Sequence, residues 1–230
     1  MAERIGILGG LTPESTVTYY LHIVHSYQRR FGDHGFPEIV VYSVSFQRFE
    51  DWMEAGEWDR IAEGLRDGIE RLAAAGAGFA VMATNTMHLL YDRLVRESPI
   101  PLLSIIDATA GAIRARGLRT VGLLGTRFTM EKPFYAEGLA RYGIASLVPD
   151  KEDREYIHRI IMDELSRGVT TEPSRLGYLS IIDKLASRGA EGVVLGCTEI
   201  PLLIRPVDTP VPLFDTAVLH AEAALERALA

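Results

Sequence analysis

The chain has 230 residues, of which 47% are hydrophobic and 24% are charged, and its formal net charge is −7. This composition is typical of globular domains, and the acidic balance argues against a nucleic-acid-binding surface, which would be basic. No apolar run approaches the roughly 20 residues of a transmembrane helix, and the N-terminus lacks the basic segment of a signal peptide. One cysteine cannot form an internal disulfide, so we expect a cytoplasmic protein. The charge and the absence of a long apolar run lead us to expect neither a nucleic acid nor a membrane as a partner.

Strand and helix signals alternate along the first half of the chain. Thr12 is a candidate helix N-cap followed by Pro13 in the first helical position. Residues 58–75 carry apolar side chains at helical spacing. Apolar runs bounded by turn residues predict strands over 5–8, 39–44, 79–82 and 102–106.

The second half shows the same alternation. Residues 151–188 favour helix throughout, and Asp215 is a candidate N-cap for a C-terminal helix over 215–230. Strands are predicted over 121–124, 145–148, 193–195 and 211–213. Strands that alternate with helices predict mostly parallel sheets with helices on both faces.

The two halves also repeat each other in sequence. Residues 4–10 match 120–126, and residues 72–87 match 185–200, at offsets close to half the chain length. Two matches in the same order indicate an internal duplication rather than a short solenoid repeat.

We therefore predict an α/β fold with two pseudo-symmetric lobes, 1–115 and 116–230, each a mostly parallel sheet flanked by helices. The chain is expected to cross between the lobes near residues 100–115 and in the C-terminal helix. The active site is expected in the cleft between the lobes, because open parallel sheets bind ligands at the carboxyl ends of their strands.

Small or polar residues stand at the ends of four predicted strands, namely Gly9-Gly10, Thr84-Asn85-Thr86, Gly125-Thr126 and Cys197-Thr198-Glu199. The duplication aligns Thr84 with Cys197. If the lobes face each other, these two side chains lie on opposite sides of one cleft.

Cys197 has two interpretations. It can be a buried core thiol, because cysteine is among the most buried residue types. Its position between a predicted strand and the start of a helix or turn favours a reactive thiol instead. A helix N-terminus lowers the pKa of a thiol from about 8.5 toward neutrality, so the position predicts a thiolate that removes a proton.

Polar residues near these strand ends are suited to a small carboxylate. The side chains of Asn85, Thr86, Thr126 and Thr198, with nearby backbone N–H groups, are candidate donors. Thr84 or Asn85 is also a candidate helix N-cap. The six histidines show no zinc spacing, so no metal is expected. GILGG lacks the spacing of a dinucleotide fingerprint, and a Walker A sequence is absent.

The segments GGLTPEST, ATNTMH, LLGTRFTME and GCTEIPLL resemble, in this order and spacing, the aspartate/glutamate racemase family of the Asp/Glu/hydantoin racemase superfamily. The resemblance covers nearly the whole chain. It implies two pseudo-symmetric lobes, a homodimer, an amino-acid substrate, and no pyridoxal phosphate or metal cofactor. It also implies two acid/base groups on opposite faces of the substrate's α-carbon, and the second of them matches Cys197.

The sequence departs from the family at the first acid/base position. Many members have cysteine where this chain has Thr84, and TNTMH resembles a branch with threonine there. A hydroxyl is far less acidic than a thiol. We therefore expect Cys197 to abstract a proton and Thr84 mainly to donate one, which, with the family's geometry, predicts a preference for L-amino acids.

The resemblance also suggests residues for the substrate's side chain. Arg48, Met53 and Arg167 lie where family members contact it, although a solvated surface position is an equal alternative for either arginine. His88 and Glu199 are expected to support the site by holding loop backbone or orienting the acid/base groups.

The leading hypothesis is a cofactor-independent racemase, an isomerase acting on aspartate, glutamate or both. A second hypothesis within the superfamily is a decarboxylase or cis–trans isomerase that uses a single cysteine. A third, from another class, is an amino-acid-binding protein that has lost turnover. Proton exchange at the α-carbon, release of CO₂, or binding without exchange would distinguish the three.

Overall fold

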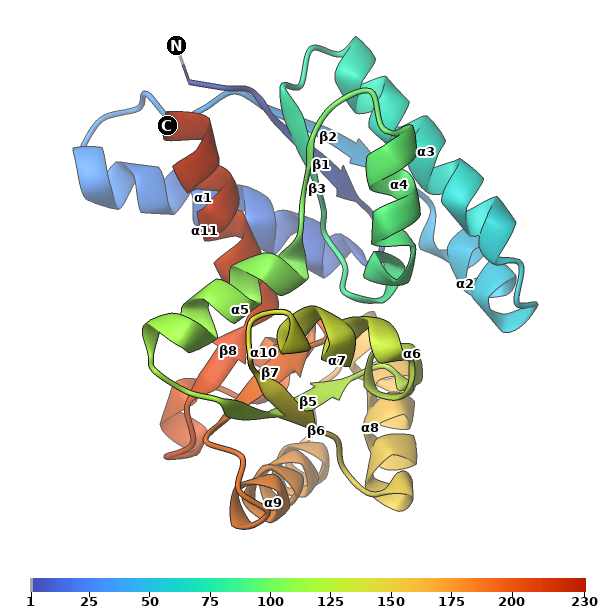
Figure 1. Cartoon of the computed structure of the whole chain (residues 1–230), viewed down its shortest axis with the longest axis vertical. Helices are drawn as coiled ribbons and strands as arrows, with labels where there is room; N and C mark the ends of the chain where they lie inside the picture. The colour runs from blue at the N-terminus through green and yellow to red at the C-terminus, as the bar shows by residue number, and fades with distance from the viewer. Residues whose placement is uncertain (1) are drawn as a thin grey trace. The chain divides into compact units, whose positions relative to one another are not determined.

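Two four-stranded parallel sheets form the framework of residues 2–230, the part of the chain that the computed structural model describes (Figure 1). These residues divide into two compact units, each built around one sheet. The first unit extends to Ile105 and includes His220–Ala230, and the second is Ile106–Leu219. The predicted α/β fold class with two parallel-sheet lobes is confirmed, whereas the duplication boundary at residue 115 stays a prediction.

The sheet of the first unit has the strand order β2-β1-β3-β4. Its strands are β1 (Ile5–Gly9), β2 (Ile39–Ser43), β3 (Phe79–Met82) and β4 (Leu102–Leu103). Its helices are α1 (Pro13–Phe31), α2 (Phe46–Glu54), α3 (Trp58–Ala74) and α4 (Tyr91–Glu97), with a 3-10 helix η1 (Thr86–Leu90) before α4. The central strands β1 and β3 are buried along their whole length, as expected for parallel strands covered on both faces.

Helix α3 shows how the apolar pattern builds this core. Ile61, Leu65, Ile69 and Leu72 are fully buried and belong to one hydrophobic cluster with Leu8 of β1. The spacing of these four residues places them on one face of the helix. The prediction of a helix over 58–75 is confirmed to within one residue.

The other face of the first sheet is covered by α1 and α11 (Thr216–Leu229), as Figure 1 shows. Tyr19 and Ile23 of α1 are fully buried. The guanidinium of Arg227 on α11 lies 4.6 Å from the ring centroid of Phe79 on β3. The last turns of the chain therefore complete the core of the first unit, although they are 100 residues and more from its other elements in sequence.

The sheet of the second unit repeats this order as β6-β5-β7-β8. Its strands are β5 (Thr120–Gly125), β6 (Ala145–Leu147), β7 (Gly192–Gly196) and β8 (Leu213–Asp215). Its helices are α5 (Ile105–Ala115), α6 (Arg127–Glu131), α7 (Pro133–Ala140), α8 (Lys151–Asp163), η2 (Leu165–Arg167), α9 (Glu172–Ser187), α10 (Ile200–Leu203) and η3 (Pro206–Asp208). Both sheets place the first and third strands at the centre, so the two units have the same topology.

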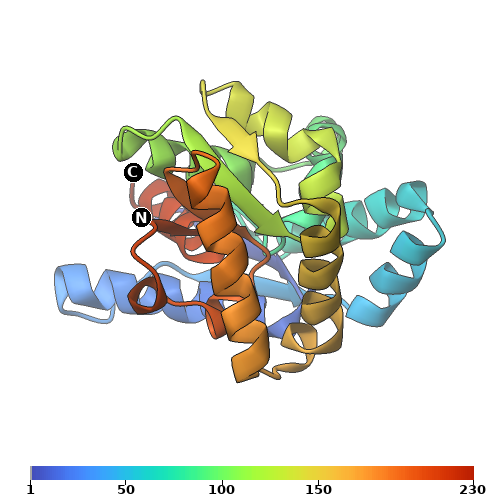
Figure 2. The same ribbon diagram turned by 90° about the horizontal axis from the view of Figure 1, so that it is seen from below.

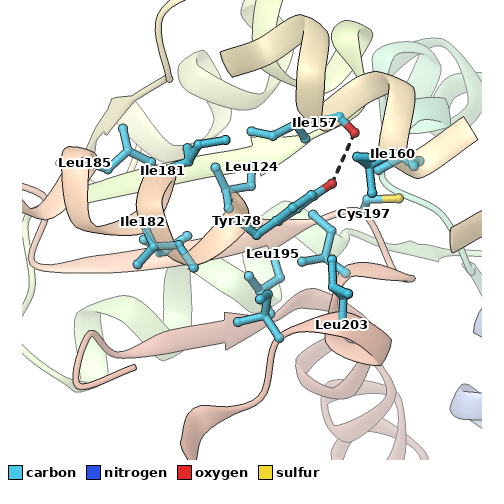
Figure 3. Close-up of a cluster of buried hydrophobic side chains, with 14 of the residues drawn as sticks. Leu124, Ile157, Ile160, Tyr178, Ile181, Ile182, Leu185, Leu195, Cys197 and Leu203 are labelled. Atoms are coloured by element: carbon cyan, nitrogen blue, oxygen red, sulfur yellow. Dashed lines mark hydrogen bonds between the residues drawn. The ribbon is translucent and has the colours of Figure 1, made fainter. Parts of the chain in front are cut away.

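Helices α8 and α9 cover one face of the second sheet, as Figure 2 shows. The cluster beneath them is built around the fully buried ring of Tyr178, whose hydroxyl donates to the carbonyl of Ile157 at 3.1 Å (Figure 3). Cys197 belongs to the same cluster. This core therefore forms one wall around the thiol.

Three element predictions differ from the structure. The strand predicted over 102–106 ends at Leu103, and α5 begins at Ile105. An apolar run alone does not separate a buried strand from a buried helix. The strand predicted over 211–213 lies at Leu213–Asp215 instead, and Pro212, which has no N–H to give to a strand ladder, lies outside it.

The long helical stretch predicted over 151–188 is broken into α8, η2 and α9. Gly168 ends η2 in the left-handed conformation, with φ of 70°, and Thr171 caps α9 by accepting a hydrogen bond from the Ser174 N–H at 3.3 Å. The predicted N-cap at Asp215 is confirmed, because its carboxylate accepts from the N–H groups of Ala217 and Val218. Among residues 2–230, every helix is too short or too polar to span a bilayer.

Candidate active site

The carboxyl ends of β1 and β3 meet at the centre of the first sheet. The chain leaves β1 toward β2 and leaves β3 toward β4, so this point is the topological switch where open α/β sheets bind ligands. Ala83, directly after β3, donates its N–H to the carbonyl of Leu8 at 2.9 Å. Ser15 Oγ lies 3.0 Å from the carbonyl oxygen of Ala83. The residue that follows β3 is therefore bonded both to β1 and to the first turn of α1.

Gly10 is fixed in the loop after β1 by its backbone conformation. Its φ is 81°, and a Cβ atom there would lie 2.2 Å from the carbonyl oxygen of Val44. Only glycine fits this position without strain. The Gly10 N–H donates to Thr16 Oγ1 at 2.8 Å, so this residue shapes the loop, and its predicted contact with substrate stays a prediction.

Thr84, Asn85 and Thr86 follow β3 and are all buried. Asn85 occupies the N-cap position of η1, but its side chain makes no capping hydrogen bond. Similarly, Thr12 occupies the N-cap position of α1 without a side-chain cap. Asn85 therefore stands at the predicted N-cap position, but its side chain does not cap the helix. Its hydrogen bond to a substrate carboxylate stays a prediction.

His88 links the Thr84 loop to the end of the first unit. Its Nδ1 lies 2.9 Å from the carbonyl oxygen of Thr84, and its Nε2 lies 3.0 Å from the N–H of Ile105. A carbonyl accepts and an amide donates, so Nδ1 carries the proton and Nε2 accepts. The ring is 3% exposed, and burial lowers the pKa of His88 from 6.5 to about 4. The expected supporting role for His88 thus has a defined geometry.

A second buried histidine was not expected from the sequence. His220, on α11, is fully buried, with Nε2 donating to the carbonyl of Leu103 at 3.0 Å and Nδ1 accepting from the hydroxyl of Tyr19 at 2.7 Å. Its ring meets that of His88 edge-on at a centroid distance of 5.9 Å. The sequence LHAEAAL places His220 among apolar residues of a helix, and this pattern could have predicted its burial. The search for zinc spacing among the histidines did not test for burial.

The second unit presents the equivalent pair of strand ends. Gly125 of β5 and Gly196 of β7 are register partners, and Thr126 and Cys197 follow them directly. Thr126 is the N-cap of α6, where its hydroxyl accepts from the Thr129 N–H at 3.3 Å. These two predicted site residues therefore lie at neighbouring strand ends within one unit.

Cys197, Thr198 and Glu199 form a compact buried group. The Cys197 thiol donates to Glu199 Oε2 at 2.9 Å, and Thr198 Oγ1 donates toward both carboxylate oxygens at 3.1 Å. The three side chains are 7%, 8% and 3% exposed, respectively. A thiol whose proton points at a carboxylate can pass that proton to it.

The predicted lowering of the thiol's pKa is wrong. Burial, followed by the charge of the Glu199 carboxylate and its hydrogen bond, raises the pKa of Cys197 well above its usual value. The backbone N–H groups of Glu199 and Thr198 oppose this shift and are outweighed. The helix that follows, α10, has only four residues. The ligand-free protein therefore holds a protonated thiol rather than a thiolate.

The residues predicted to contact the substrate's side chain lie on helices rather than directly at the strand ends. Arg48 is exposed on α2 and stacks on the ring of Trp52, with 5.1 Å between guanidinium carbon and ring centroid. Met53, also on α2, is half-buried against the first core, and Arg167 is exposed on η2. Their contact with a substrate stays a prediction. Within residues 2–230, no cluster of three or more His, Cys, Asp or Glu is arranged to hold a metal ion.

The comparisons with known proteins cover both units. The family described as Asp/Glu/Hydantoin racemase matches residues 8–224. A Yersinia pestis structure assigned provisionally as an Asp/Glu racemase is 41% identical, with a TM-score of 0.91, over 99% of this chain and 100% of that one. The structure of an aspartate racemase homologue from Pyrococcus horikoshii OT3 is 38% identical, with a TM-score of 0.86, over 100% of both chains.

A relative found by sequence agrees with these structures. The broad specificity amino-acid racemase RacX of Bacillus subtilis is 21% identical over 229 residues, which is 98% of this chain and 98% of RacX. The match spans the strand ends of both units.

Proposed function

Since the chain belongs to the Asp/Glu/hydantoin racemase family of isomerases, we propose that it racemises an acidic amino acid, aspartate or glutamate or both. The hydrogen bond from the Cys197 thiol to the Glu199 carboxylate carries this proposal. It supplies, at a strand end, an acid/base group with its own proton acceptor. We further propose that Thr84 acts on the opposite face of the substrate's α-carbon, without pyridoxal phosphate or metal.

The proton balance of the proposed reaction closes over one turnover. Glu199 takes the proton of Cys197, and the sulfur keeps the electron pair of the S–H bond. The thiolate removes the α-proton of the L-amino acid, and the Thr84 hydroxyl gives a proton to the opposite face of the carbanion. The alkoxide left on Thr84 recovers a proton from the Glu199 carboxylic acid through solvent. The substrate is inverted, and each group ends in its starting state.

Glu199 is needed in this scheme because the thiol is protonated at rest. General acid/base catalysis depends on a group that is in the correct protonation state at the working pH. A carboxylate at 2.9 Å is in direct reach of the thiol proton, whereas solvent has little access to a sulfur in a residue that is 7% exposed. The pair therefore replaces the free thiolate that the sequence predicted.

The substrate's α-carboxylate would be held by polar groups at the strand ends. Asn85 and Thr86 in the first unit, and Thr126 and Thr198 in the second, are buried or half-buried there. Hydrogen bonds to a carboxylate that gains charge as the carbanion forms are a large source of transition-state stabilisation. We propose these four residues, with the Gly10 loop, as the α-carboxylate site.

Acidic substrates are favoured because basic side chains are available for a distal carboxylate. We propose that Arg48 and Arg167 bind it, with Met53 beside the substrate's methylene groups. A guanidinium pairs with a carboxylate through two hydrogen bonds. A preference for the L-enantiomer follows from the weak basicity of Thr84, and the active form is proposed to be a homodimer.

Proton exchange at the α-carbon tests this function. The purified protein, without added cofactor, is incubated in D₂O with each enantiomer of aspartate and glutamate, and with neutral amino acids because RacX is named for broad specificity. We expect deuterium at the α-carbon together with formation of the other enantiomer. Binding without exchange would identify a protein that has lost turnover, and loss of CO₂ from a malonate would identify a decarboxylase.

A further inference from the structure

The Thr84 loop is held by an imidazole with only one consistent arrangement of its protons. His88 Nδ1 faces the Thr84 carbonyl at 2.9 Å, and His88 Nε2 faces the Ile105 N–H at 3.0 Å. A charged ring would place a second N–H against the Ile105 N–H, so donor would face donor. Both bonds exist only for the neutral ring that carries its proton on Nδ1.

Neighbouring aromatic side chains fix the plane of that ring. Tyr91 stacks on His88 with 5.3 Å between ring centroids and 8° between planes. The ring of His220 meets that of His88 edge-on, and His220 is itself hydrogen-bonded to Leu103 and Tyr19. Both histidines are buried. The ring of His88 therefore has little freedom to rotate away from the Thr84 carbonyl.

The position of these bonds in the chain is also significant. Ile105 is the last residue of the first unit before the chain enters the second, and His220 is the first residue after it returns. His88 accepts a hydrogen bond from Ile105 and contacts the ring of His220. The same ring therefore fixes the Thr84 peptide relative to both points where the chain changes unit.

From this geometry we infer that His88 is a positioning residue for Thr84: its Nδ1–H orients the Thr84 peptide, and its Nε2, by accepting from the Ile105 N–H, keeps the proton on Nδ1. The inference rests on the proposed function, in which Thr84 delivers the proton to the second face. His88 does not touch the substrate in this account. Its effect is confined to the step that Thr84 performs.

Two substitutions separate the two bonds. In His88→Asn, the side-chain amide nitrogen falls near the place of Nδ1 and can still donate to the Thr84 carbonyl. In His88→Gln, the longer side chain places its amide oxygen near Nε2, where it accepts from Ile105, and the bond to Thr84 is lost. Two controls lie outside the network. His22→Gln makes the same substitution on α1, and Leu65→Ala lowers stability through the α3 core.

The readout is the stereochemistry of deuterium incorporation from an L-substrate in D₂O. A deuteron returned by Cys197 gives labelled L-product, and a deuteron delivered by Thr84 gives labelled D-product. A loss of stability reduces the amounts of both labelled products, whereas a misplaced Thr84 reduces only the labelled D-product. We expect the D-to-L ratio of labelled product to fall by about tenfold or more in His88→Gln, since a shift of about 1 Å at a reacting group can cost about 100-fold.

His88→Asn and both controls should keep the ratio of the wild type. An unchanged ratio in folded His88→Gln would overturn the inference, as would an equal fall in His88→Asn. A wild type that incorporates no deuterium would instead remove the proposed function. Nitrogen NMR of the ligand-free wild type needs no variant and applies even if His88→Gln does not fold. A neutral His88 with its proton on Nδ1 supports the inference, and a proton on Nε2, or a charged ring at neutral pH, contradicts it.

Discussion

The thiol of Cys197 donates its proton to the carboxylate of Glu199, two residues further along the chain, at 2.9 Å. The two side chains are buried together at the end of β7, and the carboxylate keeps the thiol protonated in the ligand-free protein. In the proposed mechanism the thiol and the carboxylate act as one acid/base pair. The loss of Glu199 should therefore make the thiol more acidic but the reaction slower.

Replacement of Glu199 by glutamine should make the thiol more acidic and the enzyme slower. The negative charge that raises the pKa of Cys197 is removed, so the pH at which the thiol is half ionised should fall. The acceptor for its proton is lost as well, so exchange at neutral pH should fall by about 10²- to 10⁴-fold, the usual contribution of a general base, and recover partly at alkaline pH.

The pH dependence of alkylation by iodoacetamide measures the thiol directly, because Cys197 is the one cysteine in the chain. Glu155→Gln on the exposed face of α8 is the matched control and should alter neither property. Faster exchange in Glu199→Gln would show that the carboxylate merely restrains the thiol. An unchanged alkylation profile would show that the two groups are not coupled.

Replacement of Cys197 by serine should abolish exchange while leaving the fold intact. The substitution replaces the sulfur in the Tyr178 cluster by a smaller oxygen and retains a group that can donate to Glu199. A hydroxyl is a far weaker acid than a thiol, so we expect α-proton exchange to fall by orders of magnitude. Circular dichroism and calorimetric binding of aspartate or glutamate serve as controls. Near wild-type exchange would mean that Cys197 is only a core thiol.

Replacement of Thr84 by cysteine should increase turnover of the D-enantiomer more than that of the L-enantiomer. Removal of the α-proton from a D-substrate needs a base at position 84, which a thiol supplies better than a hydroxyl. Because free enantiomers have equal energies, the ratio of kcat/KM values cannot change, and KM must shift to compensate. Initial rates from both enantiomers are compared with those of Thr18→Cys on α1. Unchanged D turnover in a folded variant would remove Thr84 from the mechanism.

Stability should fall as the pH decreases from about 6.5 to about 4 because of the two buried histidines. Their pKa values are lowered in the folded state, to about 4 for His88 and about 3 for His220. Between these values and the model-peptide value of about 6.5, the unfolded chain binds more protons than the folded protein. The stability they contribute is therefore complete above that value and is lost on acidification, by up to about 1.4 kcal/mol per pH unit for each ring.

Urea unfolding at several pH values between 7 and 4.5 measures this slope. The side chains that face the two rings are those of Tyr19 and Tyr91, and neither carries a carboxylate. His88→Asn should have a shallower slope than the wild type, because it removes one of the two buried rings. Equal slopes in wild type and His88→Asn would mean that His88 is already charged in the folded protein.

Much of the fold could be predicted because its signals are local. The helix over 58–75 follows from four apolar residues at helical spacing, and the repeat of 72–87 in 185–200 predicts two equivalent units. The strand at 102–106 was overestimated because Ile105 and Ile106 belong to a buried helix start, which has the same composition as a buried strand. Such errors arise where burial, rather than periodicity, determines the residue type.

The position of Cys197 at a strand end was predicted, but the electrostatics of its thiol were not. The strand end that carries Cys197 is visible in the sequence, and so is the residue two positions on. The direction of the thiol's pKa is not, because it depends on how deeply Glu199 and Cys197 are buried together. The buried hydrogen bonds of His220 were not predicted, because its partners Tyr19 and Leu103 are distant in sequence. Only the folded chain brings these residues together.

The most direct test of the account is a crystal structure with an unreactive analogue of aspartate bound. The account predicts that the α-carbon lies between the Cys197 sulfur and the Thr84 hydroxyl oxygen, with each about 3–3.5 Å away on opposite faces, the distance of reacting atoms in a productive complex. It also predicts the Glu199 carboxylate beside the sulfur on the side away from the analogue. An analogue bound elsewhere, or Thr84 and Cys197 on separate surfaces, would contradict the two-group mechanism.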